Sequence, residues 1–281
     1  MPAATIRIFL VHGDPKRLRT AELSNWSGKA VAGPRSEFEG VTARDEALQP
    51  GVYFLTGTDP ETGRPSIYIG EAECIRDRVK SHLKRDFWNQ IAFFVSKDEN
   101  LTKSHIRYLE GRLIQSSREA KRASVENGMS SGAKLPESDR EEMEVFLEKV
   151  HQLLPVLGIE LLVATAKKPE STDAQEELVC RIKGLEARGY LVPNGFLVSK
   201  GSEAVKRERP STAKWPQPSI LRTKLLDEGT LIDRQDRLLF TADVEFSSPS
   251  AAASVINGGS ANGLTTWKDS AGRTLKEIQE S

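Results

Sequence analysis

The hydrophobic and polar positions in the first third of the chain predict short strands. Apolar, β-branched and aromatic residues gather in four runs, at 5–12, 52–56, 67–69 and 91–95. The turn-rich insert at 59–65 predicts that the second and third runs pair as an antiparallel hairpin. Glycine, proline, serine and charged residues dominate 13–50, which predicts an irregular lead-in after the first strand.

Apolar residues three or four positions apart predict helices at about 72–84, 102–123 and 141–154. In the first of these, Ile75, Val79 and Leu83 would form the buried face. The segment 167–175 is polar and contains Pro169, so we expect a linker there.

Beyond this linker, strands are predicted at 178–182 and 195–199, a helix at 219–228, and extended pieces at 238–241 and 244–246. Ser248 and Pro249 are suited to the N-cap and first position of a further helix. We therefore expect an α+β protein. A strand and lead-in at 1–45 would precede a domain at 46–165, with a small antiparallel three-stranded sheet flanked by helices. A second small α+β domain would occupy 175–281.

Composition excludes some classes of function. The chain has 40 basic and 40 acidic residues, so no overall field favours a polyanion and any nucleic-acid surface must be local. No apolar run approaches the ~18 residues of a membrane span, and the N-terminus lacks a signal-peptide pattern. Cys74 and Cys180 have no nearby cysteine partner. A soluble, cytoplasmic protein without membrane partners is expected.

One ordered set of residues points to a specific family. It consists of Gly51-Val-Tyr53, Tyr68-Ile-Gly70, Arg78, His82, Glu110 and Asn127. In order and approximate spacing this set resembles the GIY-YIG nuclease superfamily, over about residues 45–130. The chain departs from the pattern in having GVY for GIY and a longer hairpin loop. Arg76 competes for the place of the arginine, but Arg78 lies eight residues after Gly70 and four before His82, which matches the motif.

These residue types suit phosphodiester hydrolysis. Glu110 could hold one Mg²⁺ or Mn²⁺ ion, and Arg78 offers a planar fork of donors to a phosphate. His82 would lie one turn further along the same helix face. Tyr53 and Tyr68 could project from one face of neighbouring strands.

The resemblance implies further roles. It implies that both tyrosines line the site, with Tyr53 as the base, relayed by His82. A free tyrosine has a pKa of ~10, so this role requires a metal ion or arginine to lower it. Gly70 would let the chain turn closely past the site, and Asn127 would orient a phosphate or a metal-bound water. Lys103 and His105 are left as substrate contacts.

Each residue alone has an ordinary interpretation. The tyrosines could be common sheet residues, Arg78 and His82 a solvated helix face, and Glu110 a surface ion-pair partner of Lys103 or Arg107. The ordered combination favours an active site. The resemblance implies an endonuclease acting on DNA rather than RNA. The alternative is a non-catalytic nucleic-acid-binding protein on the same scaffold.

The C-terminal region resembles an uncharacterised domain that is recurrently fused behind such nucleases, and also domains proposed to read modified DNA. The start of the helix at Ser248 could offer N–H groups to a phosphate, and Trp267 could stack on a base. The simpler interpretation is a helix cap and a core aromatic. A third possibility is that this domain binds a protein and delivers the nuclease to an assembly.

Overall fold

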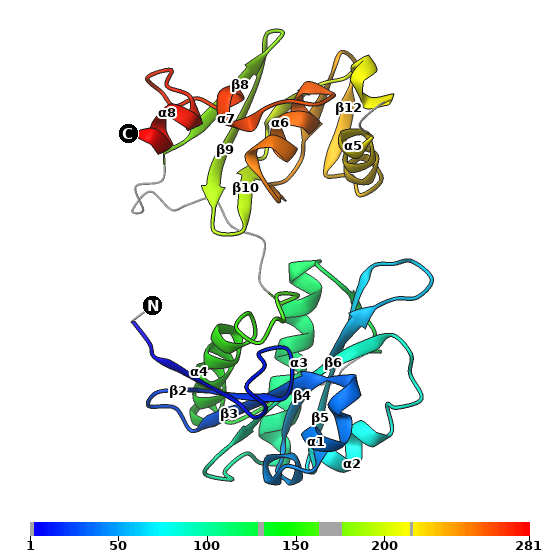
Figure 1. Ribbon diagram of the computed structural model, residues 1–281, viewed down its shortest axis with the longest axis vertical. Coiled ribbons are helices and arrows are strands. Elements are labelled where there is room, and N and C mark those ends of the chain that lie inside the picture. The colour runs from blue at the N-terminus through cyan, green and yellow to red at the C-terminus, as the bar shows by residue number, and fades with distance from the viewer. Residues whose placement is uncertain (1–2, 129–131, 163–175, 214–215) are drawn as a thin grey trace. The chain divides into compact units, whose positions relative to one another are not determined.

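A seven-stranded sheet forms the centre of the first of two units in the computed structural model (Figure 1). The model describes residues 3–128, 132–162, 176–213 and 216–281, and the units comprise 1–164 and 165–281. The expected linker at 167–175 lies outside the described residues. The α+β class is confirmed, and each unit is described by itself.

The sheet is larger than the sequence predicts. Its strands are β1 (Ile6–Leu10), β2 (Arg19–Leu23), β3 (Gly28–Pro34), β4 (Gly51–Thr58), β5 (Pro65–Ala72), β6 (Trp88–Ser96) and β7 (Ser124–Val125), in the order β1-β2-β3-β6-β4-β5-β7. The predicted hairpin is the antiparallel pair β4–β5, and β6 pairs with the other edge of β4.

The expectations of a three-stranded sheet and an irregular lead-in were therefore wrong. β3 pairs with β6 and continues the sheet through β2 to β1. The buried side chains of β2 and β3 include Ala21, Ala30 and Ala32. Such small residues give a weak strand signal, and their burial comes from packing against the rest of the unit.

Helices cover both faces of this sheet. They are η1 (Arg35–Glu37), α1 (Phe38–Thr42), η2 (Asp45–Leu48), α2 (Ile75–Lys80), α3 (Lys103–Ala120) and α4 (Glu137–Leu153). Alternate residues of β4 point to opposite faces. Phe54 packs in a core with α3 and α4, and Leu55 packs in a second core with α1 and α2.

Helix α2 is shorter than the predicted 72–84. It ends at Lys80, and the amide of His82 donates to the carbonyl oxygen of Val79 at 3.0 Å in the turn that follows. Leu83 is consequently 42% exposed, so its expected place on a buried face was wrong. His82 lies beyond the end of the helix and is buried, whereas Arg78 within the helix is exposed.

The second unit contains two smaller sheets. Its strands are β8 (Leu178–Ile182), β9 (Leu185–Val192), β10 (Gly195–Val198), β11 (Glu203–Val205), β12 (Leu231–Arg234), β13 (Arg237–Phe240) and β14 (Val244–Phe246), in the orders β14-β10-β9-β8 and β11-β13-β12. Its helices are η3 (Pro210–Ala213), α5 (Gln217–Asp227), α6 (Pro249–Asn257), α7 (Gly263–Thr266) and α8 (Leu275–Glu280). One apolar core joins these elements.

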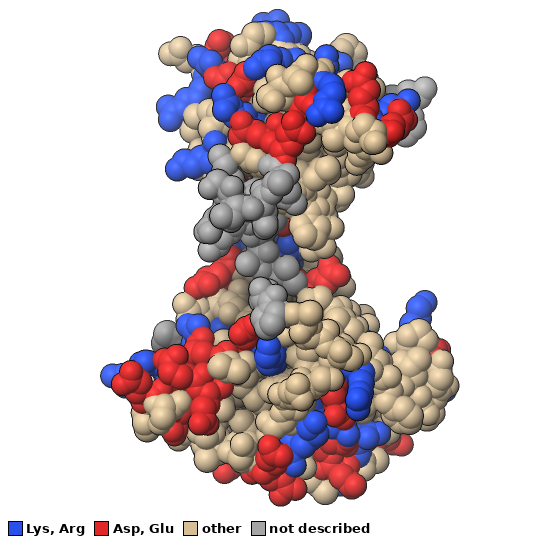
Figure 2. Space-filling view, turned by 90° about the vertical axis from the view of Figure 1, so that its left-hand side faces the viewer, with Lys and Arg blue, Asp and Glu red and all other residues tan. Residues whose placement is uncertain are grey.

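The visible surface carries charges of both signs. Figure 2 shows basic and acidic side chains interspersed on each unit, as the equal numbers of such residues in the sequence suggest. Within the described ranges, none of the helices has both the length and the apolar character that crossing a membrane requires.

Candidate active site

The two motif tyrosines lie on one face of the β4–β5 hairpin. Tyr53 is directly opposite Gly70 in the antiparallel register, and Tyr68 is opposite Leu55. A β-carbon on Gly70 would lie 2.3 Å from Cζ of Tyr53. The glycine is therefore required because the Tyr53 ring lies across β5, with its centroid 6.1 Å from that of Tyr68.

His82 joins the tyrosines from the turn after α2. Its Nε2 lies 2.9 Å from the phenolic oxygen of Tyr53, and its ring centroid is 4.6 Å from that of Tyr68. The side chain is 4% exposed, and Nδ1 has no hydrogen-bond partner among the described residues. Burial, followed by the positive charges of Arg85 and Arg78, lowers the pKa of His82 to about 4. The imidazole is therefore neutral at pH 7.

Tyr53 is fully buried, and this burial raises the pKa of its phenol well above the usual value. Tyr68 adds to the increase, and Arg78 opposes it. The pKa of Arg78 is raised, first by its charge interaction with Tyr53 and then by that with Tyr68. Arg78 therefore lies near both tyrosine side chains. It does not overcome the effect of burial, and Tyr53 is a phenol, not a phenolate, at rest.

A pocket of about 420 Å³ opens at the end of β5. Its lining residues are Glu71, Ala72, Glu73, Cys74, Asp77, Arg78, Lys103 and Glu110. The pocket brings Arg78 from α2 together with Glu110 from α3, as the sequence predicts. Arg76 is not among the lining residues, so the geometry agrees with the choice of Arg78.

Glu110 is half-buried in this pocket. The pKa of its carboxyl is raised by burial and then by the charge of Glu71, while the backbone N–H of Glu71 and the charge of Arg78 oppose the increase. A carboxylate is thus held near an arginine and a second carboxylate. This arrangement favours binding of a cation beside a phosphate.

Glu71 is a pocket residue that sequence reasoning missed. It directly follows Gly70 and continues the side of β5 on which Ile67 and Ile69 face α3. The signal was available, because a carboxylate at the next position of an apolar alternating stripe is unusual in a strand.

Two of the predicted substrate contacts have structural roles. His105 forms a capping box with Thr102 at the start of α3, and its Nε2 lies 3.5 Å from Asp139 of α4. Asn127 accepts a hydrogen bond from the N–H of Ile69 at 3.0 Å and donates to its carbonyl oxygen at 2.5 Å. Neither side chain lines the pocket. Asn127 instead fixes the backbone of β5 between Tyr68 and Gly70.

Lys103, the third predicted contact, does line the pocket. Its Nζ lies 2.9 Å from Glu73 and 3.9 Å from Glu71. The lysine is thus already engaged with carboxylates at the pocket rim.

The pocket offers few ligands to a metal ion. A group of three or more histidine, cysteine, aspartate or glutamate side chains suited to a metal ion is not found in the described part of the chain. Carboxylates of Glu71, Glu73, Asp77 and Glu110 line the pocket, and Glu73 is paired with Lys103. Oxygen donors of this kind fit Mg²⁺ or Mn²⁺, since Mg²⁺ is commonly bound through one or two carboxylates together with waters and phosphate oxygens.

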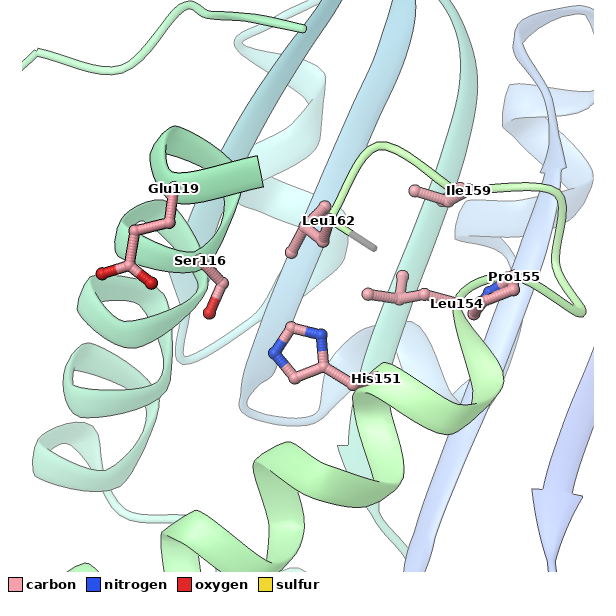
Figure 3. Close-up of a pocket in the computed structure, with 7 residues that line it drawn as sticks. All are labelled: Ser116, Glu119, His151, Leu154, Pro155, Ile159 and Leu162. Carbon is pink, nitrogen blue, oxygen red and sulfur yellow. The ribbon is translucent and has the colours of Figure 1, made fainter. Parts of the chain in front are cut away.

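A second pocket of about 440 Å³ lies between α3 and α4 (Figure 3). Ser116 and Glu119 line it from α3, and His151 lines it from α4, together with apolar residues. Burial lowers the pKa of His151. None of the residues singled out in the sequence lies here, and the described residues that line the pocket include no arginine or lysine to bind a phosphate.

In the C-terminal unit, Ser248 and Trp267 have structural roles. Trp267 is fully buried, 4.3 Å from the Phe196 ring centre to centre, and its Nε1 donates to the carbonyl oxygen of Pro249 at 3.0 Å. Ser248 caps α6 by accepting from the amide of Ala251. The burial of Trp267 does not agree with stacking on a base, and the favoured interpretation as cap and core aromatic agrees with the structure.

Comparison with known proteins gives one match, in the C-terminal region. Residues 178–279 match the family model described as Domain of unknown function (DUF4357). This match covers the second unit and leaves the pocket between α2 and α3 outside it. No curated protein and no solved structure matches the chain.

Proposed function

We propose that the N-terminal unit is a metal-dependent endonuclease of the GIY-YIG type that hydrolyses phosphodiester bonds, in DNA rather than RNA. One observation carries the proposal. Arg78 lies close enough to Tyr53 and Tyr68 for its charge to interact with both side chains, and it also lines a pocket with Glu110. A phosphate binder, a proton-transfer group and a metal ligand are thus adjacent.

In such a reaction, a water oxygen bonds to phosphorus, the bond from phosphorus to the leaving sugar oxygen breaks, and that oxygen takes up a proton. Arg78 would bind the phosphate oxygens, whose charge increases in the transition state. Tyr53 would accept the proton of the water while its own proton passes to Nε2 of His82 at 2.9 Å. Because Tyr53 is fully buried at rest, this step requires that substrate binding open its hydroxyl group to the water. This relay suits a phenol whose raised pKa excludes a resting phenolate.

Glu110 would hold the metal ion, which agrees with the donor chemistry of the pocket. When bound, Mg²⁺ or Mn²⁺ would polarise a phosphate oxygen and offset the negative charge that develops there. Arg78 and Lys103 would orient the phosphate against this position, and the neutral His82 would keep the Tyr53 hydroxyl fixed.

The experiment is nicking of supercoiled plasmid DNA with Mg²⁺ or Mn²⁺, by the wild-type protein and by Glu110→Ala. Glu119→Ala, on the same helix but outside the pocket, is the matched control. Nicking by the wild type and the control, but not by Glu110→Ala, would support the proposal. Equal nicking by all three, or no nicking with any metal ion, would contradict it. A single-stranded RNA of similar length tests the preference for DNA.

A non-catalytic nucleic-acid-binding protein is the second candidate. The observation that favours it is the exposed Arg78 beside Tyr53, whose phenol has a raised pKa. Binding of a nucleic acid needs the arginine, but it does not need Tyr53 to act as a base. This candidate predicts salt-sensitive binding that Arg78→Ala weakens and Glu110→Ala leaves intact. Plasmid nicking that depends on Glu110 would exclude it.

A further inference from the structure

One buried carboxylate in the pocket has no role in the reaction as described above. The side chain of Glu71 is 18% exposed, and its Oε2 is buried without a hydrogen-bond partner among the described residues. Burying a carboxylate oxygen with no compensating partner is costly. The protein therefore keeps an acceptor free at the point where β5 ends beside α3.

The neighbouring lysine does not satisfy this oxygen. Nζ of Lys103 lies 3.9 Å from Oε1 of Glu71, at the limit of an ion pair, and only 2.9 Å from Glu73. Glu73 is the more exposed of the two carboxylates, with 67% of its side chain accessible. The lysine is thus held chiefly at the rim, and the inner oxygen of Glu71 stays available.

Glu71 also lies beside Glu110. Both side chains line the same pocket, and their charges repel each other there. Two carboxylates held together in this way are destabilised unless a cation lies between them or one takes up a proton. Both carboxylates therefore lie where one cation in the cavity would offset their repulsion.

We propose that Glu71 is a second protein ligand of the metal ion that Glu110 binds. This inference rests on the proposed function, because it concerns the same metal site. A pair of carboxylates from a strand and a helix is a donor set that Mg²⁺ and Mn²⁺ accept, with the remaining positions left to water and to phosphate oxygens. Glu71 thereby makes the site bind metal before any nucleic acid is present.

The test is Mn²⁺ binding by the whole chain in the absence of nucleic acid. Binding is measured as the loss of the electron paramagnetic resonance signal of free Mn²⁺. The variants are Glu71→Gln, Glu110→Gln and, as matched control, Glu73→Gln, which changes the neighbouring exposed carboxylate. We expect the first two to weaken Mn²⁺ binding by about tenfold or more, and the control to stay within about twofold of the wild type.

Folding is checked independently of metal. Glutamine has nearly the volume of glutamate, and the Glu71→Gln substitution removes the repulsion with Glu110, so Tm at pH 7 should not fall. A lower Tm with unchanged Mn²⁺ affinity would show a purely structural role and would overturn the inference.

The outcomes separate the two proposals. If Glu110→Gln loses Mn²⁺ and plasmid nicking while Glu71→Gln binds Mn²⁺ like the wild type, the inference fails and the nuclease stands. If the wild type binds no Mn²⁺ and nicks no DNA, both fail. Weakened Mn²⁺ binding by Glu71→Gln with wild-type binding by Glu73→Gln supports the inference.

Discussion

The phenolic oxygen of Tyr53 and Nε2 of His82 lie 2.9 Å apart in a part of the protein closed to solvent. The two residues come from the centre of the sheet and from the turn after α2. The contact links the tyrosine to the one imidazole in this region that burial keeps neutral. Several consequences of this contact and of its surroundings can be measured.

Tyr53→Phe removes only the hydroxyl group. We expect the rate of plasmid nicking to fall by about 10²–10⁴-fold, the usual contribution of a proton-transfer group. The buried Nε2 of His82 also loses its partner, which costs about 1–3 kcal/mol of unfolding free energy. Tyr108→Phe is the control, because it loses a comparable hydrogen bond, to Glu144, away from the pocket. Equal nicking by both variants would contradict the role of Tyr53.

The low pKa of His82 predicts how stability depends on pH. The unfolded chain binds a proton at His82 below about pH 6.5, whereas the folded protein binds it only near its pKa of about 4. The contribution of His82 is therefore fully present above about pH 6.5 and is lost as the pH falls toward 4. Between these limits it amounts to roughly 1–3 kcal/mol.

Urea unfolding at pH 4.5 and 6.5, for the wild type and His82→Gln, measures this contribution. The difference in unfolding free energy between the two pH values should be smaller for the variant. The same difference in both proteins would show that His82 titrates normally.

Arg85 is expected to contribute to this low pKa. Its guanidinium carbon lies 4.9 Å from the centre of the Tyr68 ring, and its positive charge disfavours a protonated His82. Arg85→Ala should raise the pKa of His82, which would still lie below 6.5 because burial is the larger cause. NMR titration of the imidazole measures the change, and an unchanged or lower pKa would contradict the assignment.

Gly70 is predicted to tolerate no larger side chain, because the Tyr53 ring packs against it. A β-carbon at Gly70 would meet the Tyr53 ring at 2.3 Å, whereas one at Gly128 would meet nothing within 4 Å. Gly70→Ala should therefore lower the unfolding free energy by about 1–3 kcal/mol, as overpacking does, and displace Tyr53 enough to reduce nicking. Gly128→Ala should leave both close to wild type. Denaturant unfolding and plasmid nicking of the two variants provide the comparison.

The sequence alone could predict the hairpin of Tyr53 and Tyr68, because their strands are short runs of apolar, β-branched and aromatic residues and a turn-rich insert separates them. It could also place Arg78 and Glu110 by motif spacing. It could not place His82, since a spacing of four residues predicts a continuous helix and the turn after Lys80 depends on tertiary packing. Glu71 was missed although its carboxylate follows the apolar stripe of Ile67 and Ile69, because that signal does not show that Glu110 of α3 lines the same pocket.

Substitution of Asn127 tests whether this residue has a structural role or binds substrate. Its side chain makes two hydrogen bonds to the backbone of Ile69, between Tyr68 and Gly70. Asn127→Ala should therefore lower the unfolding free energy by about 1–3 kcal/mol, because backbone groups of β5 lose their partners. Cleavage should slow through kcat, as the tyrosine pair loses its fixed position, with KM nearly unchanged.

The control for Asn127 is Asn89→Ala, an exposed asparagine on β6, which should change neither stability nor cleavage. A phosphate contact by Asn127 would give the opposite pattern, since loss of such a contact raises KM and leaves the unfolding free energy unchanged. Denaturant unfolding and steady-state cleavage of a short duplex, measured on both variants, decide between the two roles. A raised KM with wild-type stability would return Asn127 to the substrate-binding residues and remove it from those that hold β5.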